Sequence, residues 1–318
     1  MTEDARTLEF PLVGPAGEPI DLWRTCFSHG FTDLPPMRVD EAARTLEITV
    51  PFDGVRPRTV RIKAGREGYG ALEVGGRPLG PRGRARLLAA VKHVLRLDES
   101  LAEFYALAGA DPELAWVSAG AGRMVRSPTV FEEVVKTVCT TNCSWALTRR
   151  MVGALVEHLG EPAPGAPASG WRGRAFPTPD AMADAGVRFY RSVVHAGYRA
   201  PYLRDLARAV ARGRVDLEAL GRAGPDGVSD DEVAARLAAL PGVGPYAVAH
   251  IMLLLGRYSL LVLDSWTRPA YARLSGVRRA ADRTIRRRFR GYGRYAGLAF
   301  WLYVTRPWVP PAATPSEG

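Results

Sequence analysis

The feature that most constrains the fold is the stretch from Ser229 to Tyr271, in which the sequence LPGVG separates two helical patterns. Ser229 followed three residues later by Glu232 predicts a capped helix start, and apolar residues follow at helical spacing: Val233, Leu237 and Leu240. Proline lacks an amide donor and glycine tolerates positive φ, so residues 241–244 must end this helix in a tight turn. Pro245 suits the first position of the next helix.

Such a turn has a chemical consequence at its backbone. The first N–H groups of a helix have no partner inside the helix and point outward, which is a geometry that binds phosphate. Gly242, Val243 and Gly244 are therefore candidate backbone contacts to a phosphate. An ordinary helical hairpin is the alternative, and the turn alone does not decide between the two. One carboxylate, Asp264, follows after a short apolar run.

The charge of the chain is unevenly placed. The net charge is +10, but residues 1–100 carry 15 basic and 14 acidic groups, so the remainder holds 28 basic and 19 acidic groups. Ten arginines lie between Arg268 and Arg294, with Asp282 as the one acid among them. A basic region of this kind favours a polyanion partner. A GC-rich genome would explain arginine in place of lysine, but not the excess of positive charge.

Several classes of protein are disfavoured. No apolar run approaches ~18 residues, so we expect no membrane span, and the first residues lack a signal pattern, so we expect a cytoplasmic, nucleoid-associated protein. The three cysteines, Cys26, Cys139 and Cys143, cannot form a disulfide framework and lack paired zinc spacing. We expect no metal and no cofactor.

Periodicity divides the chain of 318 residues into two structural regions. Leu46, Ile48 and Val50 alternate with polar residues, and residues 7–80 as a whole read as β structure. The short connections favour antiparallel pairing. From Arg84 the period is helical. We therefore predict an α+β fold: a small N-terminal antiparallel sheet domain (1–83) packed on a mostly α-helical body (84–306), with a disordered Pro-rich tail (307–318).

Four further segments carry a resemblance. They are LRLDESLAEFYA (Leu95–Ala106), CTTNCSWALTRR (Cys139–Arg150), AGYRAPYLRDLARAV (Ala196–Val210) and YAGLAFWLYV (Tyr295–Val304). Together with LPGVG and the aspartate after it, they resemble the helix-hairpin-helix–GPD superfamily of DNA base-excision glycosylases, closest to its 8-oxoguanine and 3-methyladenine II branches. The resemblance covers most of residues 95–305. It implies a monomer that binds double-stranded DNA containing a damaged base. Three cysteines are too few for the iron–sulfur cluster of some relatives.

The resemblance places the catalytic aspartate on Asp264. Breaking an N-glycosidic bond develops positive charge on the sugar, and a carboxylate beside that charge stabilises the transition state more than the ground state. It can also orient or deprotonate water. The alternative role is to cap a helix that starts near Ser265. Both roles can hold together, because a helix N-terminus keeps such a carboxylate ionised.

The position of the lysine that nicks DNA in bifunctional relatives is occupied by Tyr246, and no lysine follows Lys136. Tyrosine cannot form an imine, so the sequence predicts a monofunctional glycosylase that uses water. A non-catalytic damaged-DNA binding protein and an 8-oxoguanine-type glycosylase remain as alternatives.

Five residues are expected at the DNA interface by resemblance. Asn142 matches the residue that fills the gap left by the extruded base, Tyr198 matches a wedge between bases, and Arg199 matches a contact to the partner base. Trp266 and Arg268 follow the catalytic position on its DNA-facing side. Helix capping is the alternative for Asn142, and core packing is the alternative for Tyr198.

Four residues are expected to line the base pocket: Tyr246, His250, Phe300 and Val304. Phe300 falls where the 8-oxoguanine branch reads guanine with a glutamine. An aromatic pocket suits a cationic alkylated purine through stacking and cation–π attraction, so we expect alkylated purine ahead of oxidised guanine. The alternative is that these aromatic residues belong to the core.

Overall fold

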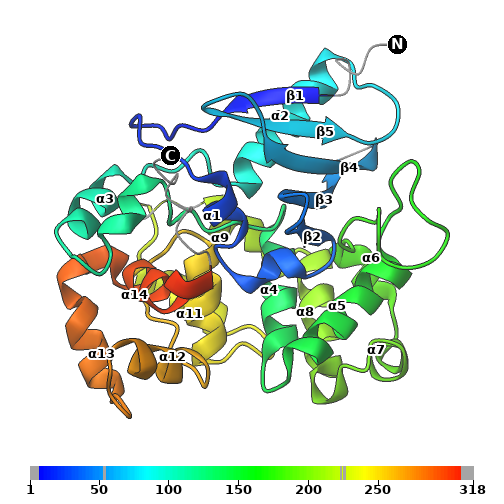
Figure 1. Cartoon of the computed structure of the whole chain (residues 1–318). Coiled ribbons are helices and arrows are strands. Elements are labelled where there is room, and N and C mark those ends of the chain that lie inside the picture. Colours follow the sequence, from blue (N-terminus) through cyan, green and yellow to red (C-terminus); the bar gives the residue numbers. More distant parts are fainter. Residues whose placement is uncertain (1–6, 53–54, 223, 225–226, 309–318) are drawn as a thin grey trace.

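The computed structural model describes residues 7–52, 55–222, 224 and 227–308. Its N-terminal region forms a five-stranded antiparallel sheet in the order β1-β5-β4-β3-β2, seen at the top of Figure 1. The strands are β1 (Thr7–Pro11), β2 (Met37–Asp40), β3 (Thr45–Phe52), β4 (Val55–Ala64) and β5 (Tyr69–Val74). Leu46 pairs with Ile62, and Ile48 with Val60. All four side chains are buried, so the predicted antiparallel sheet with a buried face is confirmed.

One helix covers the buried face of this sheet. Leu87, Val91 and Val94 of α2 (Pro81–Val94) belong to the same apolar cluster as the inward strand residues. The expectation of β structure throughout residues 7–80 is wrong between β1 and β2, where α1 (Leu22–Cys26) and the 3₁₀ turn η2 (Gly30–Asp33) lie. Asp21 starts α1, because its carboxylate accepts a hydrogen bond from the Arg24 N–H at 2.9 Å.

The rest of the described chain is helical, which confirms the predicted α+β class. The α-helices of this region are α3 (Ala102–Gly109), α4 (Val130–Thr140), α5 (Trp145–Leu159), α6 (Pro179–Asp184), α7 (Val187–Ser192), α8 (Ala200–Ala211), α9 (Leu217–Arg222), α10 (Asp230–Ala238), α11 (Pro245–Leu254), α12 (Thr267–Leu274), α13 (Asp282–Phe289) and α14 (Ala296–Thr305). The 3₁₀ turns are η3 (Ala115–Ala119), η4 (Gly197–Arg199), η5 (Arg290–Tyr295) and η6 (Arg306–Trp308). None of the helices described is both long and apolar enough to cross a bilayer. The tail predicted from residue 307 falls, beyond Trp308, outside the described residues.

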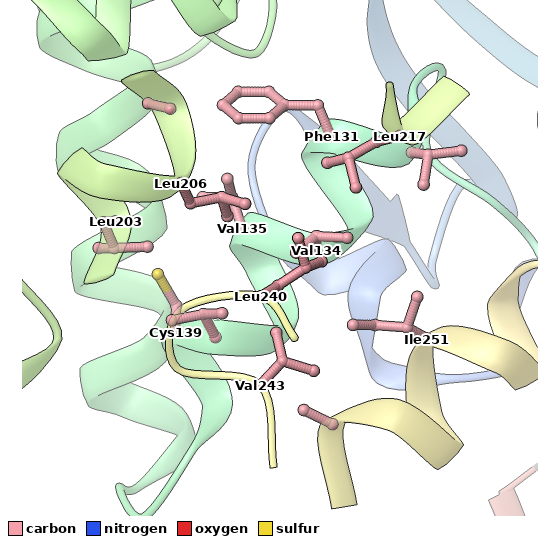
Figure 2. Packing of buried hydrophobic residues seen from close by; sticks show 14 of the residues in the cluster. Phe131, Val134, Val135, Cys139, Leu203, Leu206, Leu217, Leu240, Val243 and Ile251 are labelled. Atoms are coloured by element: carbon pink, nitrogen blue, oxygen red, sulfur yellow. The ribbon is translucent and has the colours of Figure 1, made fainter. Parts of the chain in front are cut away.

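Helix α4 lies at the centre of one apolar core. Figure 2 shows Val134 and Cys139 of α4 packed among side chains from α8, α11 and the turn after α10. Leu240 and Val243 of that turn are both 7% exposed. The α10–α11 turn is therefore fixed to the core by an apolar residue on each side of Gly242.

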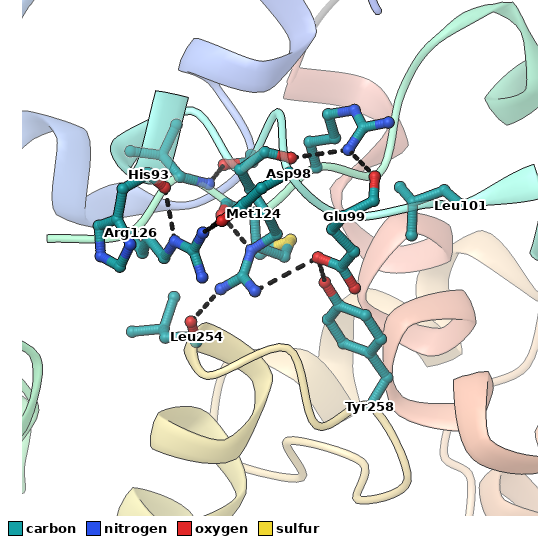
Figure 3. A network of polar contacts seen from close by, with 12 residues as sticks. His93, Asp98, Glu99, Leu101, Met124, Arg126, Leu254 and Tyr258 are labelled. Atoms are coloured by element: carbon teal, nitrogen blue, oxygen red, sulfur yellow. Dashed lines mark hydrogen bonds and ion pairs between the residues drawn. The ribbon is translucent and has the colours of Figure 1, made fainter. Parts of the chain in front are cut away.

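The buried Arg96 ties the end of α2 to the end of α11, in the polar network of Figure 3 that includes Met124 and Leu254. Arg96 donates hydrogen bonds to the carbonyl oxygens of Met124, at 2.9 Å, and Leu254. Its third contact is to the Glu99 carboxylate at 3.3 Å, which also accepts a bond from the Tyr258 hydroxyl. A charge buried to this extent requires such partners. The network holds the last turn of α11 in place against the segment that leaves the sheet region.

Candidate functional site

The predicted helix start and turn are confirmed. The Ser229 hydroxyl accepts a hydrogen bond from the Glu232 N–H at 3.2 Å, and Pro245 is the first residue of α11. Gly242 has φ +79°, and a Cβ there would lie 3.0 Å from the Tyr202 side chain. Only glycine meets both conditions without strain. The turn is therefore specified by sequence at this position.

Val243 and Gly244 have different roles in this turn. The Val243 N–H donates to the Leu240 carbonyl at 3.2 Å, so this amide is used inside the turn. Gly244 caps α11 with φ −97°, and no atom lies within 4 Å of where its Cβ would be. The helix N-terminus at Gly244 is thus open to an approaching anion, whereas Val243 anchors the turn.

The Asp264 carboxylate is held by the backbone that follows it. Its Oδ1 accepts hydrogen bonds from the Trp266 N–H at 2.8 Å and the Thr267 N–H at 2.6 Å. The Thr267 hydroxyl accepts from the Asp264 N–H at 2.9 Å. Within the described part of the chain, no group donates to Asp264 Oδ2. One carboxylate oxygen is therefore fixed at the start of α12, and the other is available to a ligand.

A cavity of about 1320 Å³ lies beside this carboxylate and the α10–α11 turn. Nine of the residues predicted for the site line it: Asn142, Tyr198, Gly242, Gly244, Tyr246, His250, Asp264, Trp266 and Arg268. They come from the α4–α5 turn, η4, the α10–α11 turn, α11 and the start of α12. Residues far apart in sequence are thus brought to one concave surface.

Two of the predicted pocket residues lie elsewhere, and the expectation for them is corrected. Phe300 and Val304 of α14 are 0% and 1% exposed and are not among the cavity residues. Phe300 packs on Phe289 and Tyr271, with ring centroids 5.5 Å and 6.4 Å away. The α14 residue that reaches the cavity is Trp301.

Aromatic rings form much of the cavity wall. Trp266 lies 6.1 Å from Trp301 and 5.4 Å from Trp308, measured between ring centroids. The ring of His250 lies 5.9 Å from Trp301, 5.0 Å from Phe31 and 5.8 Å from Tyr246, so the aromatic wall is continuous. The Tyr246 hydroxyl is within 3.3 Å of the Thr140 hydroxyl. Flat apolar walls of this kind suit a flat ligand.

His250 is a cavity residue whose buried ring nitrogens have no hydrogen-bond partner among the described residues. It is 5% exposed. Burial lowers the pKa of His250 to about 4, although the Asp264 charge acts in the opposite direction. The imidazole is therefore neutral at pH 7, with one donor and one acceptor unused.

The Asn142 turn carries a second group of predicted residues. Asn142 has φ +46°, and its amide donates to the Tyr198 hydroxyl at 3.2 Å. Tyr198 is 53% exposed, so core packing does not account for it. Arg199 was expected to contact DNA, but in this structure it is 4% exposed and its guanidinium donates to the carbonyl and hydroxyl of Thr141. Arg199 therefore supports the Asn142 turn through hydrogen bonds to the preceding residue, Thr141.

The N-terminal region also contributes to the cavity, although none of its residues was among the predicted site residues. Gly30, Phe31 and Asp33 of η2 line the cavity. The Trp145 indole donates to the Asp33 carboxylate at 3.1 Å, and a Cβ on Gly30 would meet the Trp145 ring at 3.0 Å. The aromatic-rich sequence of residues 21–31 indicates a possible pocket border, but such segments are more often core, and no site residue was predicted there.

No metal site is evident in the part of the chain that the structure describes, since no three His, Cys, Asp or Glu side chains gather there in a suitable arrangement. The three cysteines are free thiols, and two of them, Cys26 and Cys139, are buried.

Comparisons with known proteins place the fold. No family model matches this sequence, and no curated protein matches it. Solved structures do match. The structure of MBOgg1 with a low-affinity DNA ligand has a TM-score of 0.72 at 18% identity, covering 95% of this chain and 96% of that one. The 3-methyladenine DNA glycosylase from Archaeoglobus fulgidus has a TM-score of 0.71 at 19% identity, covering 95% and 99%.

A third match is the 8-oxoguanine glycosylase/lyase from Clostridium acetobutylicum in its apo form, with a TM-score of 0.69 at 19% identity over 94% of this chain and 96% of that one. The chain therefore has the fold of these proteins over nearly its whole length. The expected likeness to helix-hairpin-helix–GPD glycosylase structures is confirmed at the level of fold.

Proposed function

We propose that this protein is a DNA glycosylase that removes a damaged purine by hydrolysis. The observation that carries the proposal is the position of Asp264, whose carboxylate lines an aromatic cavity that the Gly242–Gly244 turn also lines. A carboxylate next to a phosphate-binding turn lies where it can act on the sugar of a nucleotide drawn from DNA. The fold shared with DNA glycosylases supports the same conclusion.

In this mechanism the Asp264 carboxylate stabilises positive charge that develops on the deoxyribose as the base leaves. The two backbone N–H donors on Oδ1 fix its orientation before substrate arrives, so little reorganisation is needed in the transition state. The free Oδ2 accepts a proton or a hydrogen bond from the attacking water. An abasic site is the product.

The nucleotide must first leave the duplex, at a cost of a few kcal/mol in lost stacking and pairing. Asn142 and the exposed ring of Tyr198 lie together at the cavity rim. We assign them to the space that the base vacates, where they replace part of the lost stacking and hydrogen bonding. The open N-terminus of α11 at Gly244 holds a backbone phosphate nearby.

The substrate class follows from the cavity wall. Indole and phenol rings attract a cationic base through their π faces, and two carboxylates, Asp33 and Asp264, also line the cavity. Alkylation at a ring nitrogen gives a purine a positive charge and makes it a good leaving group. An alkylated purine is therefore the favoured substrate ahead of 8-oxoguanine.

We also propose that the enzyme lacks lyase activity. Tyr246 occupies the position of the nucleophilic lysine and cannot form an imine. Lys136 lies outside the set of cavity residues, is 0% exposed and is paired with the Glu132 carboxylate at 2.6 Å. Water is then the nucleophile.

The test is a panel of duplexes, each carrying one defined lesion, scored for free base and, after alkali, for strand cleavage. We expect free base from 3-methyladenine or 7-methylguanine duplexes and strand cleavage only after alkali. Asp264→Asn is the matched variant, since the amide keeps an acceptor for the two N–H donors. It should bind DNA normally and release at least about 10²-fold less base. Binding without base release by the wild type on every lesion would instead support a non-catalytic DNA-binding protein.

A further inference from the structure

The arginines near the C-terminal end of the chain divide into two groups. Three of the ten between Arg268 and Arg294 have acidic partners: Arg268 binds Asp282 at 2.8 Å, Arg288 binds Asp111 at 2.6 Å, and Arg294 binds Glu103. Among the described residues, seven have exposed side chains and no carboxylate within ion-pair distance, although the charge of Asp282 still acts on Arg286: Arg273, Arg278, Arg279, Arg283, Arg286, Arg287 and Arg290. The three paired arginines are partly neutralised by nearby carboxylates, whereas the seven others leave most of their positive charge exposed.

Four of the exposed arginines share one side of α13 and of the helical residue Arg290 that directly follows it. Arg283, Arg286, Arg287 and Arg290 are spaced i, i+3, i+4 and i+7, which places them on the same face of a helix. The opposite face packs through Ile285 and Phe289, which are both fully buried. Like charges at this spacing repel and destabilise an isolated helix. A bound polyanion would remove that repulsion.

This arginine face begins beside the cavity. Arg268 lines the cavity and its guanidinium makes two hydrogen bonds, at 2.8 and 3.0 Å, to Asp282, the first residue of α13. From Asp282 to Arg290 the helix advances about 12 Å. Figure 1 shows α12 and α13 together at the edge of the helical body that lies farthest from the sheet. The α13 arginines therefore start one ion pair away from a residue that lines the cavity.

We propose that the α13 arginine face binds the sugar–phosphate backbone of the duplex arm on one side of the extruded nucleotide. This inference rests on the proposed function, because it takes DNA to be the occupant of the cavity. Duplex DNA carries one negative charge per about 1.7 Å of its axis, so an arm leaving the cavity presents several phosphates over the length of α13. Guanidinium groups match phosphate geometry and read no base. The contact lengthens the DNA footprint without adding sequence preference.

The experiment measures binding of the purified full chain, as a function of salt, to undamaged duplexes and to duplexes that carry an abasic-site analogue. The variant is Arg283→Gln/Arg286→Gln/Arg290→Gln. The control, Arg77→Gln/Arg82→Gln/Lys92→Gln, removes the same charge from exposed side chains in and before α2, at the other end of the molecule. Duplexes of 10 base pairs are compared with duplexes of 25 base pairs. In a second series, a short duplex carries an abasic-site analogue at its centre and is lengthened on only the 5′ side or only the 3′ side of the analogue. Melting temperatures confirm that both variants fold.

We expect the α13 variant to lower the slope of log K against log salt by about 2 to 3 and to weaken binding to the long duplex at least about tenfold. The affinity for the 10-base-pair duplex should change much less in this variant. For the wild type, lengthening the short duplex on one side of the analogue should restore tight binding, and lengthening it on the other side should not. The control should retain its affinity. Equal losses on short and long duplexes, or in variant and control, would overturn the proposal. So would a variant that binds DNA normally but loses affinity for anionic lipid vesicles.

These outcomes are separable from the proposed enzymatic function. Binding to undamaged duplex is measured without any base release, so an inactive wild type would still give a clear answer about α13. Conversely, an active enzyme whose long-duplex binding is unchanged in the α13 variant would refute this inference alone.

Discussion

Asp264 and Thr267 hold each other by a reciprocal pair of hydrogen bonds. The Asp264 carboxylate accepts from the Thr267 N–H at 2.6 Å, and the Thr267 hydroxyl accepts from the Asp264 N–H at 2.9 Å. The same hydroxyl donates to the Val262 carbonyl at 2.7 Å, and Thr267 is fully buried. This pair orients the one acid on which the proposed chemistry depends.

The first prediction concerns that orientation. Thr267→Val keeps the shape of the side chain but leaves the Asp264 N–H and the Val262 carbonyl without partners, so we expect a loss of about 1–3 kcal/mol in unfolding free energy. The rate of base release under single-turnover conditions should fall about 10- to 100-fold, because the carboxylate is no longer fixed. Thr267→Ser, which restores the hydroxyl, should recover most of the rate. A destabilised Thr267→Val enzyme with an unchanged rate would contradict the positioning role.

The second prediction concerns the lyase reaction. With borohydride present, the wild type should give no covalent adduct with damaged DNA. Tyr246→Lys places an amine in the cavity, where burial favours its neutral, nucleophilic form. This variant should give a trapped adduct, measured by gel mobility. An adduct formed by the wild type would refute the proposed hydrolytic mechanism.

The third prediction concerns pH. Burial lowers the pKa of His250 to about 4, while the unfolded chain has the ordinary value of about 6.5. Between these values the unfolded state binds more protons, so this residue's contribution to stability is lost as pH falls from about 6.5 to about 4. The contribution changes by up to about 1.4 kcal/mol per pH unit.

Denaturant unfolding of His250→Phe at pH 6.5 and pH 5.0 tests this. Between pH 6.5 and pH 5.0, the free energy of unfolding should fall by about 2 kcal/mol less in the variant than in the wild type. At pH 7 the variant should be at least as stable as the wild type, because two unpaired buried nitrogens are removed. Burial raises the pKa of Glu133 to about 7 and gives an opposite slope, but it acts equally in both proteins. His158→Gln, at an exposed site, serves as the control. Identical pH dependence in wild type and His250→Phe would show that His250 is not a buried neutral group.

The fourth prediction separates the two glycines of the turn. Gly244 has an ordinary φ and open space around its Cβ position, so Gly244→Val should cost about 1 kcal/mol or less in stability. It should still weaken DNA binding at least about tenfold, alike for damaged and intact duplexes, because the side chain blocks phosphate from the amide. Gly242→Val should instead destabilise the fold, since φ is +79° and Tyr202 is close. Normal DNA affinity in Gly244→Val would exclude this turn as a phosphate contact.

Local patterns in the sequence were sufficient for much of the architecture. The alternation at Leu46, Ile48 and Val50 predicted a strand with a buried face, and the Ser229 cap and Pro245 marked the helices on each side of the turn. These signals depend on backbone chemistry and on two-fold or 3.6-fold periodicity, both of which a single sequence displays.

The pocket wall was harder to predict for a physical reason. Helix α14 is buried on all sides, so its apolar pattern has no polar face and does not indicate which residues reach the cavity. Phe300 and Val304 face the core, and Trp301 faces the site. Similarly, nothing local to Arg199 indicated that the Thr141 carbonyl would accept its guanidinium.

The contact from Arg199 to Thr141 has a consequence for how the protein would search a genome. This guanidinium supports the chain just before Asn142, whose left-handed backbone is formed in the protein without DNA; under the proposed function, the residue would need no rearrangement to enter the duplex. A turn that is already ordered loses no further conformational entropy when Asn142 contacts a base pair. The pace of inspection along intact DNA would then depend on how readily each pair opens, so weakened pairs would be sampled first.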